Sequence, residues 1–210
     1  ARAALIAAAC DEIIAGRWDA EFPLSVWQTG SGTQTNMNLN EVIANRANQL
    51  GGDAGPALHP NDHVNRAQSS NDVFPAVMHV AAVQRCDARL LPALRHLRQS
   101  IRRRAREFAK TSKTGRTHLM DAMPLRFDQE LGAWATQIDE VEARLGDALK
   151  RLRRLPIGGT AIGTGINAPK RFGAEVCAAL KVRTGVAFAP HRDRFYGIAT
   201  QDAALELSGA

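Results

Sequence analysis

The sequence of 210 residues has few aromatic residues and only three cysteines. Its single tyrosine and three tryptophans lie outside the arginine-rich stretches, whereas nucleic-acid-binding surfaces interleave aromatic and basic side chains. The cysteines show neither a C-x-x-C motif nor a paired spacing, so they indicate neither a zinc site nor a disulfide framework. We therefore expect a protein of a reducing compartment, the cytoplasm, that does not bind nucleic acid.

A long hydrophobic run is also absent. The alanine-rich residues 3–9 are followed at once by Cys10, Asp11 and Glu12. A membrane-spanning helix needs about 20 consecutive apolar residues. Nothing in the sequence resembles a signal peptide or a membrane anchor. We therefore predict no membrane partner.

Positive charge is in excess, with a formal net charge of +6. Most of it comes from arginines within helical patterns, where such runs commonly form solvated helix faces. A positive field would also raise the rate at which a small dianionic substrate meets its site. The charge thus suits a small anionic ligand without requiring one.

Hydrophobic spacing predicts a mainly helical protein, and 45% hydrophobic residues are enough to bury a substantial core. Apolar residues recur every three or four positions before Phe108 and again from Phe127 to Leu152, with a polar break over 111–124. This pattern predicts two antiparallel helices of about 30 residues, the first of them kinked at Pro92. No segment alternates as a strand, and shorter helices are predicted over 40–50, over 171–184 and from about residue 198.

The composition divides the chain in two. Residues 17–72 are rich in Ser, Thr, Asn, Gly and Pro, so residues 1–68 are predicted to form a smaller loop-rich head. Residues 69–210 are predicted to form a long-helix bundle. The sequence lacks an initiating methionine, and both of its ends lie within helical patterns. We therefore expect an internal piece of a longer protein, with an incomplete bundle.

Four polar segments are candidates for chemistry, because they fall at the ends and junctions of helices. The first, residues 29–38, reads TGSGTQTNMN. Its glycines let backbone N–H groups approach an anion, and its hydroxyls and amides can hold carboxylate oxygens without adding a competing negative charge. The alternative interpretation is a flexible turn.

The second segment, residues 58–65, reads LHPNDHVN and places two histidines four residues apart near Asp62. A metal site is one interpretation. Pro60 disfavours the helical face that such a pair needs, and the segment lacks the glutamate of the H-E-x-x-H motif. We therefore predict a hydrogen-bonded loop without a metal.

The third segment, Gln68 to Asp72, directly precedes the first long helix. One of Ser70, Asn71 and Asp72 could simply be the N-cap. A helix N-terminus also has free N–H groups and a partial positive charge, so the same segment can hold a carboxylate. The two interpretations are compatible.

The fourth segment, residues 113–124, reads KTGRTHLMDAMP and joins the two long helices. Histidine is the side chain best suited to proton transfer near neutral pH, which makes His118 the best candidate for a general acid or base. A purely structural loop histidine is the alternative.

A glycine- and threonine-rich stretch over 158–165 has only a superficial sequence similarity to a phosphate-binding loop. Thr164 stands where the lysine of that motif belongs, and no predicted strand precedes the stretch. We therefore exclude a nucleotide site.

Taken together and in order, the four segments resemble the motifs of class II fumarases, within the fumarase and aspartase superfamily. The family motifs G-S-G-T, H-P-N-D, S-S-N-D and G-R-T-H-L-x-D-A-x-P match residues 30–33, 59–62, 69–72 and 115–124. Aspartate ammonia-lyases instead have S-A-G-T, S-T-N-D and T-Q, so the first and third motifs and Thr117-His118 favour a fumarase. The resemblance covers nearly the whole chain.

The resemblance implies an all-α long-helix bundle with an N-terminal substrate-binding domain. It implies reversible hydration of fumarate to malate, as in the tricarboxylic acid cycle, with His118 as a catalytic acid or base and without a metal or organic cofactor. The residues implied to bind the substrate are Ser31, Gly32, Thr33, Ser69, Ser70, Asn71 and Thr117. Those implied to form an accessory dicarboxylate site are His59, Pro60, Asn61 and Asp62, although Pro56 stands where relatives often have a basic residue.

The resemblance also implies a homotetramer in which three chains contribute to each active site. Fumarases carry a G-S-S-x-M-P-x-K-x-N loop with a catalytic serine, and this sequence does not occur here. The loop normally lies beyond the position of Ala210. We therefore expect the chain alone to have little or no hydratase activity.

Two other functions stay open. Another lyase of the superfamily, such as an aspartate ammonia-lyase, would share the fold and release a different leaving group. A non-catalytic helical scaffold would keep the fold, but scaffolding does not require the four polar segments.

Overall fold

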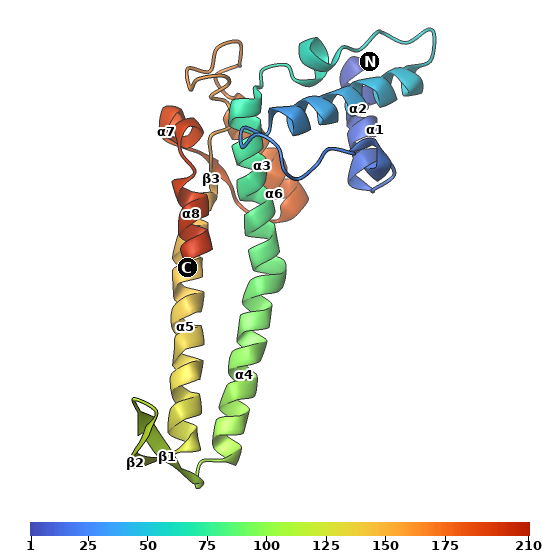
Figure 1. Cartoon of the computed structure of the whole chain (residues 1–210). Coiled ribbons are helices and arrows are strands. Elements are labelled where there is room, and N and C mark those ends of the chain that lie inside the picture. The colour runs from blue at the N-terminus through green and yellow to red at the C-terminus, as the bar shows by residue number, and fades with distance from the viewer. The chain divides into compact units, whose positions relative to one another are not determined.

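The computed structural model describes residues 1–210, and helices make up most of the chain (Figure 1). The prediction of a mainly helical protein is confirmed. The chain forms two compact units. Unit 1 comprises residues 1–79 and 154–201, and unit 2 comprises residues 80–153 and 202–210. None of the helices is both long and apolar enough to cross a membrane.

Unit 1 begins with two packed helices. Helix α1 spans Arg2–Ile14, and α2 spans Thr33–Gly51 after a short 3-10 turn, η1 (Asp19–Glu21). One buried cluster joins Ala9 of α1, Ile43 and Ala47 of α2, and Leu58 in the loop that follows. The residues packed around this cluster are Leu5, Ile6, Cys10, Ile13, Leu39 and Val64. The apolar stripes of the two helices thus form the core of this part of the unit.

Helix α2 begins earlier than predicted. The predicted start near residue 40 was wrong, because the polar residues from Thr33 onward already belong to the helix. Gly32 is its N-cap, in the left-handed conformation with φ of 66°. A Cβ at Gly32 would lie 2.2 Å from the ring of Phe74, so only glycine fits between the two segments. The predicted end of the helix at Gly51 and Gly52 is confirmed.

Unit 1 also contains the first turns of α3 (Ser70–Arg85). Before α3 lies a single π-helical turn, η2 (Pro60–Val64). Strands β3 (Arg154–Leu155) and β4 (Ala189–Pro190) pair in parallel, and the loop that follows β3 is buried over residues 156–160. Helices α6 (Phe172–Thr184) and α7 (Arg194–Ala199) complete the unit, and α6 confirms the helix predicted over 171–184.

Two long helices form unit 2. Helix α3 continues through a π turn, η3 (Cys86–Leu90), into α4 (Leu91–Glu107), and α5 spans Phe127–Leu152. Helices α4 and α5 lie side by side and run in opposite directions, which confirms the predicted antiparallel pair (Figure 1). Helix α8 (Asp202–Gly209) packs against α5. The single helix predicted from about residue 198 was wrong, because α7 ends before Thr200 and α8 is a separate helix.

Pro92 lies at the second position of α4. The π turn directly precedes it, and the N–H of Leu91 donates to the carbonyl of Cys86, five residues back. Proline has no N–H to continue this pattern. Leu90 and Leu91 keep right-handed helical dihedral angles, so the helical path continues through the proline.

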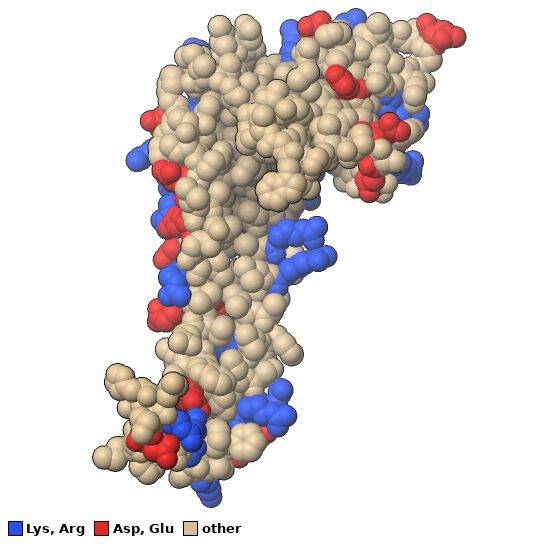
Figure 2. Space-filling view, viewed as in Figure 1, with Lys and Arg blue, Asp and Glu red and all other residues tan.

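Ion pairs connect α4 with α5. Arg98 Nη1 lies 2.5 Å from Asp139 Oδ1 and 2.8 Å from Glu142 Oε2. Arg102 Nη2 lies 2.6 Å from Asp139 Oδ2, so this arginine of the basic runs is paired rather than only solvated. Figure 2 shows basic and acidic side chains mixed along the surface of this unit.

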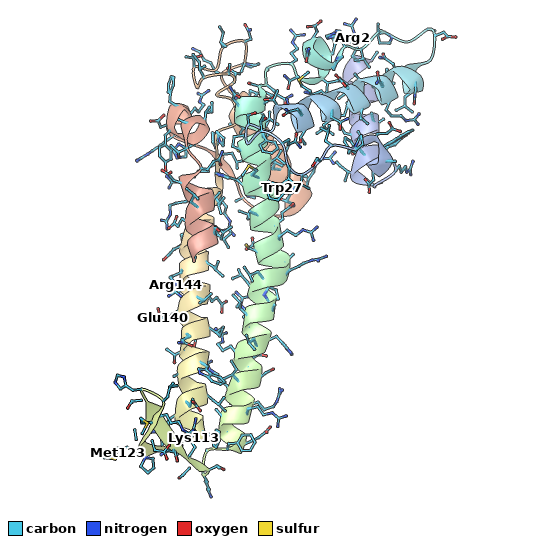
Figure 3. The ribbon with its side chains drawn as sticks, in the orientation of Figure 1. Arg2, Trp27, Lys113, Met123, Glu140 and Arg144 are labelled. Carbon is cyan, nitrogen blue, oxygen red and sulfur yellow. The ribbon has the colours of Figure 1, made fainter.

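A β-hairpin joins α4 to α5. Strands β1 (Ser112–Thr117) and β2 (Met120–Arg126) are antiparallel, so the prediction that the chain has no strand was wrong. Most of their side chains are exposed on both faces, and this removes the period-two alternation by which a strand is recognised. Lys113 Nζ lies 2.6 Å from Glu130 Oε2 and attaches the hairpin to the first turns of α5. Figure 3 labels Lys113 and Met123 on the hairpin.

Candidate functional site

Three of the four polar segments meet around a pocket of about 770 Å³ in unit 1. Thr33 stands at the start of α2, Asn61 and Asp62 lie in η2, and Ser69 and Ser70 stand at the start of α3. The loop after β3 supplies a further wall with Thr160, Ala161, Ile166 and Asn167. Hydroxyls and amides therefore dominate the lining, as a site for a small polar anion requires.

The start of α3 is built by reciprocal capping. Ser69 is the N-cap, because its Oγ accepts a hydrogen bond from the N–H of Asn71 at 3.2 Å. The carboxylate of Asp72 accepts the N–H of Ser69 at 2.9 Å in return. The prediction that the N-cap is one of Ser70, Asn71 and Asp72 was therefore wrong, since these residues form the first helical turn. Ser70 faces the pocket at the positive end of the helix.

An asparagine on α2 connects two walls of the pocket. Asn36 Nδ2 donates to Ser70 Oγ at 3.0 Å and to Asn65 Oδ1 at 3.4 Å. Asn36 and Asn40 are buried on the same side of α2, four residues apart, and both line the pocket. Asn36 therefore fixes the direction of the Ser70 hydroxyl.

The first polar segment forms a row of hydroxyls. Thr29 Oγ1 lies 3.0 Å from Ser31 Oγ, and Ser31 Oγ lies 3.2 Å from Thr33 Oγ1. Thr33 is half-buried and lines the pocket, whereas Ser31 is exposed. Glycine is required at position 32 because the backbone there is left-handed and lies against the ring of Phe74.

The second segment is a hydrogen-bonded turn. His59 caps η2, because its Nδ1 accepts the N–H groups of Asn61 and Asp62 at 3.3 Å each. His63 Nδ1 accepts the N–H of His59 at 2.9 Å. The predicted hydrogen bonding is confirmed, although the segment is a π-helical turn rather than a loop. Of the four residues implied for the accessory site, Asn61 and Asp62 line the pocket.

The fourth segment lies in unit 2, on the β1–β2 hairpin. Thr117 pairs with Met120, which leaves His118 and Leu119 as the two central residues of the turn. Both have positive φ, 50° for His118 and 64° for Leu119, as a type I′ turn requires. Thr117 and His118 are exposed to solvent. The hairpin thus presents the predicted acid or base at its tip.

The sequence did not identify the loop after β3 as part of the site. Asp72 is fully buried, and its Oδ2 accepts the N–H groups of Gly158 and Thr160 at 2.9 Å each. Asn71 Nδ2 donates to the carbonyl of Ala161 at 2.8 Å. Burial raises the pKa of the Asp72 carboxyl above its ordinary value, and the N–H groups that it accepts oppose this rise.

Other lining residues were also missed. Asn36 lies in a segment that was singled out, but its role depends on α2 starting at Thr33. Arg66 contributes a basic side chain to the lining, between two of the recognised motifs. The glycines of the 158–165 stretch were the one sequence signal that the loop after β3 could belong to the site. Glycines let another segment approach the backbone closely, and they do so in structural loops as well as in phosphate sites.

Comparison with known proteins gives a match over the whole chain. A protein-family model described as "Lyase" matches residues 1–210. The fumarate hydratase class II of Xylella fastidiosa (strain Temecula1) is 56% identical over 204 residues, which are 97% of this chain and 42% of that protein. The fumarate hydratase class II of Thermosynechococcus vestitus is 52% identical over 212 residues, which cover 100% of this chain and 45% of that protein. The chain spans less than half the length of these curated relatives.

Solved structures share the fold of this chain. The crystal structure of a recombinant class II fumarase from Schistosoma mansoni matches with a TM-score of 0.94 at 40% identity, over 99% of this chain and 47% of that chain. A fumarate lyase:delta crystallin from Brucella melitensis bound to cobalt matches with a TM-score of 0.90 at 37% identity, over 99% of this chain and 46% of that chain.

Proposed function

The chain belongs to the lyase family, and we propose that the complete protein is a class II fumarate hydratase that adds water reversibly to fumarate to give malate. The resemblance seen in the four motifs and the identity of 56% and 52% to the two class II fumarate hydratases above support the same activity.

The observation that supports this function most directly is the composition of the pocket in unit 1. Thr33, Ser69 and Ser70 bring hydroxyls from two helix starts to one cavity, and Asn36 orients one of them. Helix N-termini and neutral donors suit a carboxylate, because they offer hydrogen bonds and partial positive charge. The charged side chains in the lining are one acid, Asp62, and one base, Arg66. A dicarboxylate such as fumarate fits this chemistry.

The pocket residues would act on the charge that develops during the reaction. Removal of a proton next to a carboxylate spreads negative charge onto that carboxylate. Donors that already face the pocket, such as the hydroxyls of Thr33 and Ser70, would stabilise this charge and supply much of the acceleration. The substrate carboxylate is itself the electron sink, so the proposed reaction needs no metal or organic cofactor.

We assign the proton transfer at the water oxygen to His118, with Thr117 beside it as a substrate ligand. The complete protein is proposed to be a homotetramer, in which the hairpin of one subunit serves a pocket that other subunits build. The exposed hairpin tip suits such a role. The free thiols of Cys10, Cys86 and Cys177 support the proposed cytoplasmic location.

The alternative within the superfamily is an ammonia-lyase. Glutamine stands at the position of His118 in aspartate ammonia-lyases, and an amide cannot move a proton to or from water. The presence of His118 therefore favours the hydratase. The scaffold alternative gives no reason for the partly buried hydrogen bond between Asn36 and Ser70.

The test compares the complete wild-type protein with its His118→Gln variant. We expect the wild type to convert malate to fumarate, followed by fumarate absorbance, and to release no ammonia from aspartate. The variant should lose activity by about a hundredfold or more, as expected for a lost general acid or base. His96→Gln, on the exposed surface of α4, is the matched control and should retain activity. Ammonia release from aspartate, or an unaffected His118→Gln variant, would overturn the proposal.

A further inference from the structure

The buried carboxylate of Asp72 has no place among the residues assigned to the substrate. We propose that Asp72 is a positioning residue: it clamps residues 158–161 to the N-terminus of α3 and so holds two walls of the pocket in the geometry that binds a dicarboxylate. The catalytic part of this inference rests on the proposed function, whereas the clamp can be tested without it.

Three N–H donors converge on the two oxygens of Asp72. Oδ1 accepts the N–H of Ser69, and Oδ2 accepts those of Gly158 and Thr160, each at 2.9 Å. The side chain is 0% exposed, so no water competes for these donors. Only an ionised carboxylate offers two acceptor oxygens and no donor in so small a side chain. An isosteric amide would turn its NH₂ toward at least one N–H.

Neighbouring contacts strengthen the clamp from both sides. Asn71, which directly precedes Asp72, donates from Nδ2 to the carbonyl of Ala161 at 2.8 Å. Arg194 of α7 donates from Nη1 to the carbonyl of Gly158 at 2.6 Å. The loop is therefore held through backbone groups at three of its four residues, and α3 supplies three of the bonds.

The loop conformation is one that needs external support. Thr160 has φ of 55°, a left-handed conformation that is unfavourable for a β-branched residue. Gly158, at φ of 88°, and Gly159 leave the backbone before it with wide conformational freedom. Such strain persists only where the surroundings fix the chain, and the Asp72 carboxylate does this at Thr160 itself.

The two clamped segments are opposite sides of one site. Ser69 and Ser70 line the pocket from α3, and Thr160 and Ala161 line it from the loop. The Asn71 amide takes its orientation from Ala161, so a displaced loop would also misdirect a residue assigned to the substrate. Displacements of about 1 Å at a reacting centre can cost about a hundredfold in rate.

Hydrogen exchange of the backbone amides tests the clamp directly. We expect Asp72→Leu, which removes both acceptor oxygens at a similar side-chain size, to raise the exchange rates of Gly158 and Thr160 by about tenfold or more. The amides of Ile43 and Ala47, in the α1–α2 core, should be unaffected. Glu41→Gln, an exposed charge change on α2, is the matched control and should leave the loop protected. Unchanged exchange at residues 158–161 would refute the clamp. An equal rise throughout unit 1 would do so as well, since it would mean a general role in folding.

Kinetics of the complete protein test the catalytic part. We expect kcat of Asp72→Asn to fall by about a hundredfold, because the geometry of the pocket is lost. KM for malate should change by less than about threefold. The lost geometry weakens binding of the anion, whereas removal of the negative charge of Asp72 strengthens it, and the two effects on KM oppose each other. A purely structural role would instead lower the amount of active protein and leave kcat per active site unchanged. If the wild type has no hydratase activity, the proposed function fails, and the exchange experiment still decides the clamp.

Discussion

Arg46 of α2 holds Glu12 of α1 with two hydrogen bonds, from Nε to Oε2 at 2.7 Å and from Nη2 to Oε1 at 2.9 Å. The indole N–H of Trp18 donates to the same Oε2 at 2.8 Å, and the guanidinium lies 5.0 Å from the centroid of the Trp18 ring. Together the Arg46 and Trp18 donors lower the pKa of Glu12 to about 2. The group joins α1 and α2 beside their hydrophobic core.

This pKa predicts an acid-sensitive contribution to stability. The folded-state pKa of Glu12 lies below its ordinary value of 4.5, so the unfolded chain binds the proton more readily. The contribution is therefore present above pH 4.5 and is lost as the pH falls toward 2. Glu12→Gln should lower the urea midpoint of unfolding at pH 7 and lessen its decline between pH 5 and pH 3.

The matched control for Glu12 is Glu21→Gln, which removes another carboxylate of unit 1 that makes no hydrogen bond or ion pair. Its urea midpoints should follow those of the wild type at each pH. If Glu12→Gln declined with acid as steeply as the wild type, the Arg46 contact would not be the source of the sensitivity.

Gly32 should tolerate no side chain. Gly32→Ala would place a Cβ 2.2 Å from the Phe74 ring and force a left-handed backbone on a residue that disfavours it. We expect a loss of at least about 2 kcal/mol in the free energy of unfolding, from backbone strain and overpacking together. Gly30→Ala, where a Cβ meets nothing within 4 Å, should cost less than about 0.5 kcal/mol. Urea unfolding followed by circular dichroism measures both, and equal losses would contradict the packing argument.

The long helices could be predicted because their apolar residues follow the helical period over many turns, as in α5. The start of α2 could not be predicted this way. Its first two turns, from Thr33 to Asn38, are almost entirely polar, and the signal for its start is the left-handed conformation of Gly32 against Phe74. That contact joins residues 42 positions apart in sequence, so local propensity does not reveal it.

Charge at the α2 wall of the pocket should control the affinity for an anion. Asn36→Asp would place a carboxylate within hydrogen-bonding distance of Ser70, where a substrate carboxylate is proposed to bind. Two negative charges near 4 Å repel by about 4 kcal/mol at an effective dielectric constant of 20, so KM for malate should rise by at least about tenfold. Asn45→Asp, exposed on the same helix, should change KM by less than about twofold. A similar rise in both variants would point to long-range charge rather than to contact at the pocket.

The site was predicted in part. The segments with Thr33, Ser69 and Ser70 were recognised by their polar composition at helix ends, and the structure brings them to one pocket. The pairing of Asp72 with Gly158 spans 86 residues, and neither residue has a local pattern that indicates the other. The hairpin was missed for a different reason, since two exposed faces leave no alternation to detect.

The hairpin turn gives a last prediction, because it places a leucine where glycine is preferred. Leu119 has φ of 64° and is 96% exposed. Its backbone is therefore strained, and its side chain gains no packing contacts in return. Leu119→Gly should stabilise unit 2 by about 0.5–1 kcal/mol, the relief of left-handed strain less the added flexibility of glycine in the unfolded chain. Leu119→Ala removes the same exposed side chain but keeps the strain, so it should be nearly neutral. Urea unfolding compares the two variants. If alanine stabilised as much as glycine, the gain would come from removing an exposed hydrophobic group, and the turn at His118 and Leu119 would not be strained.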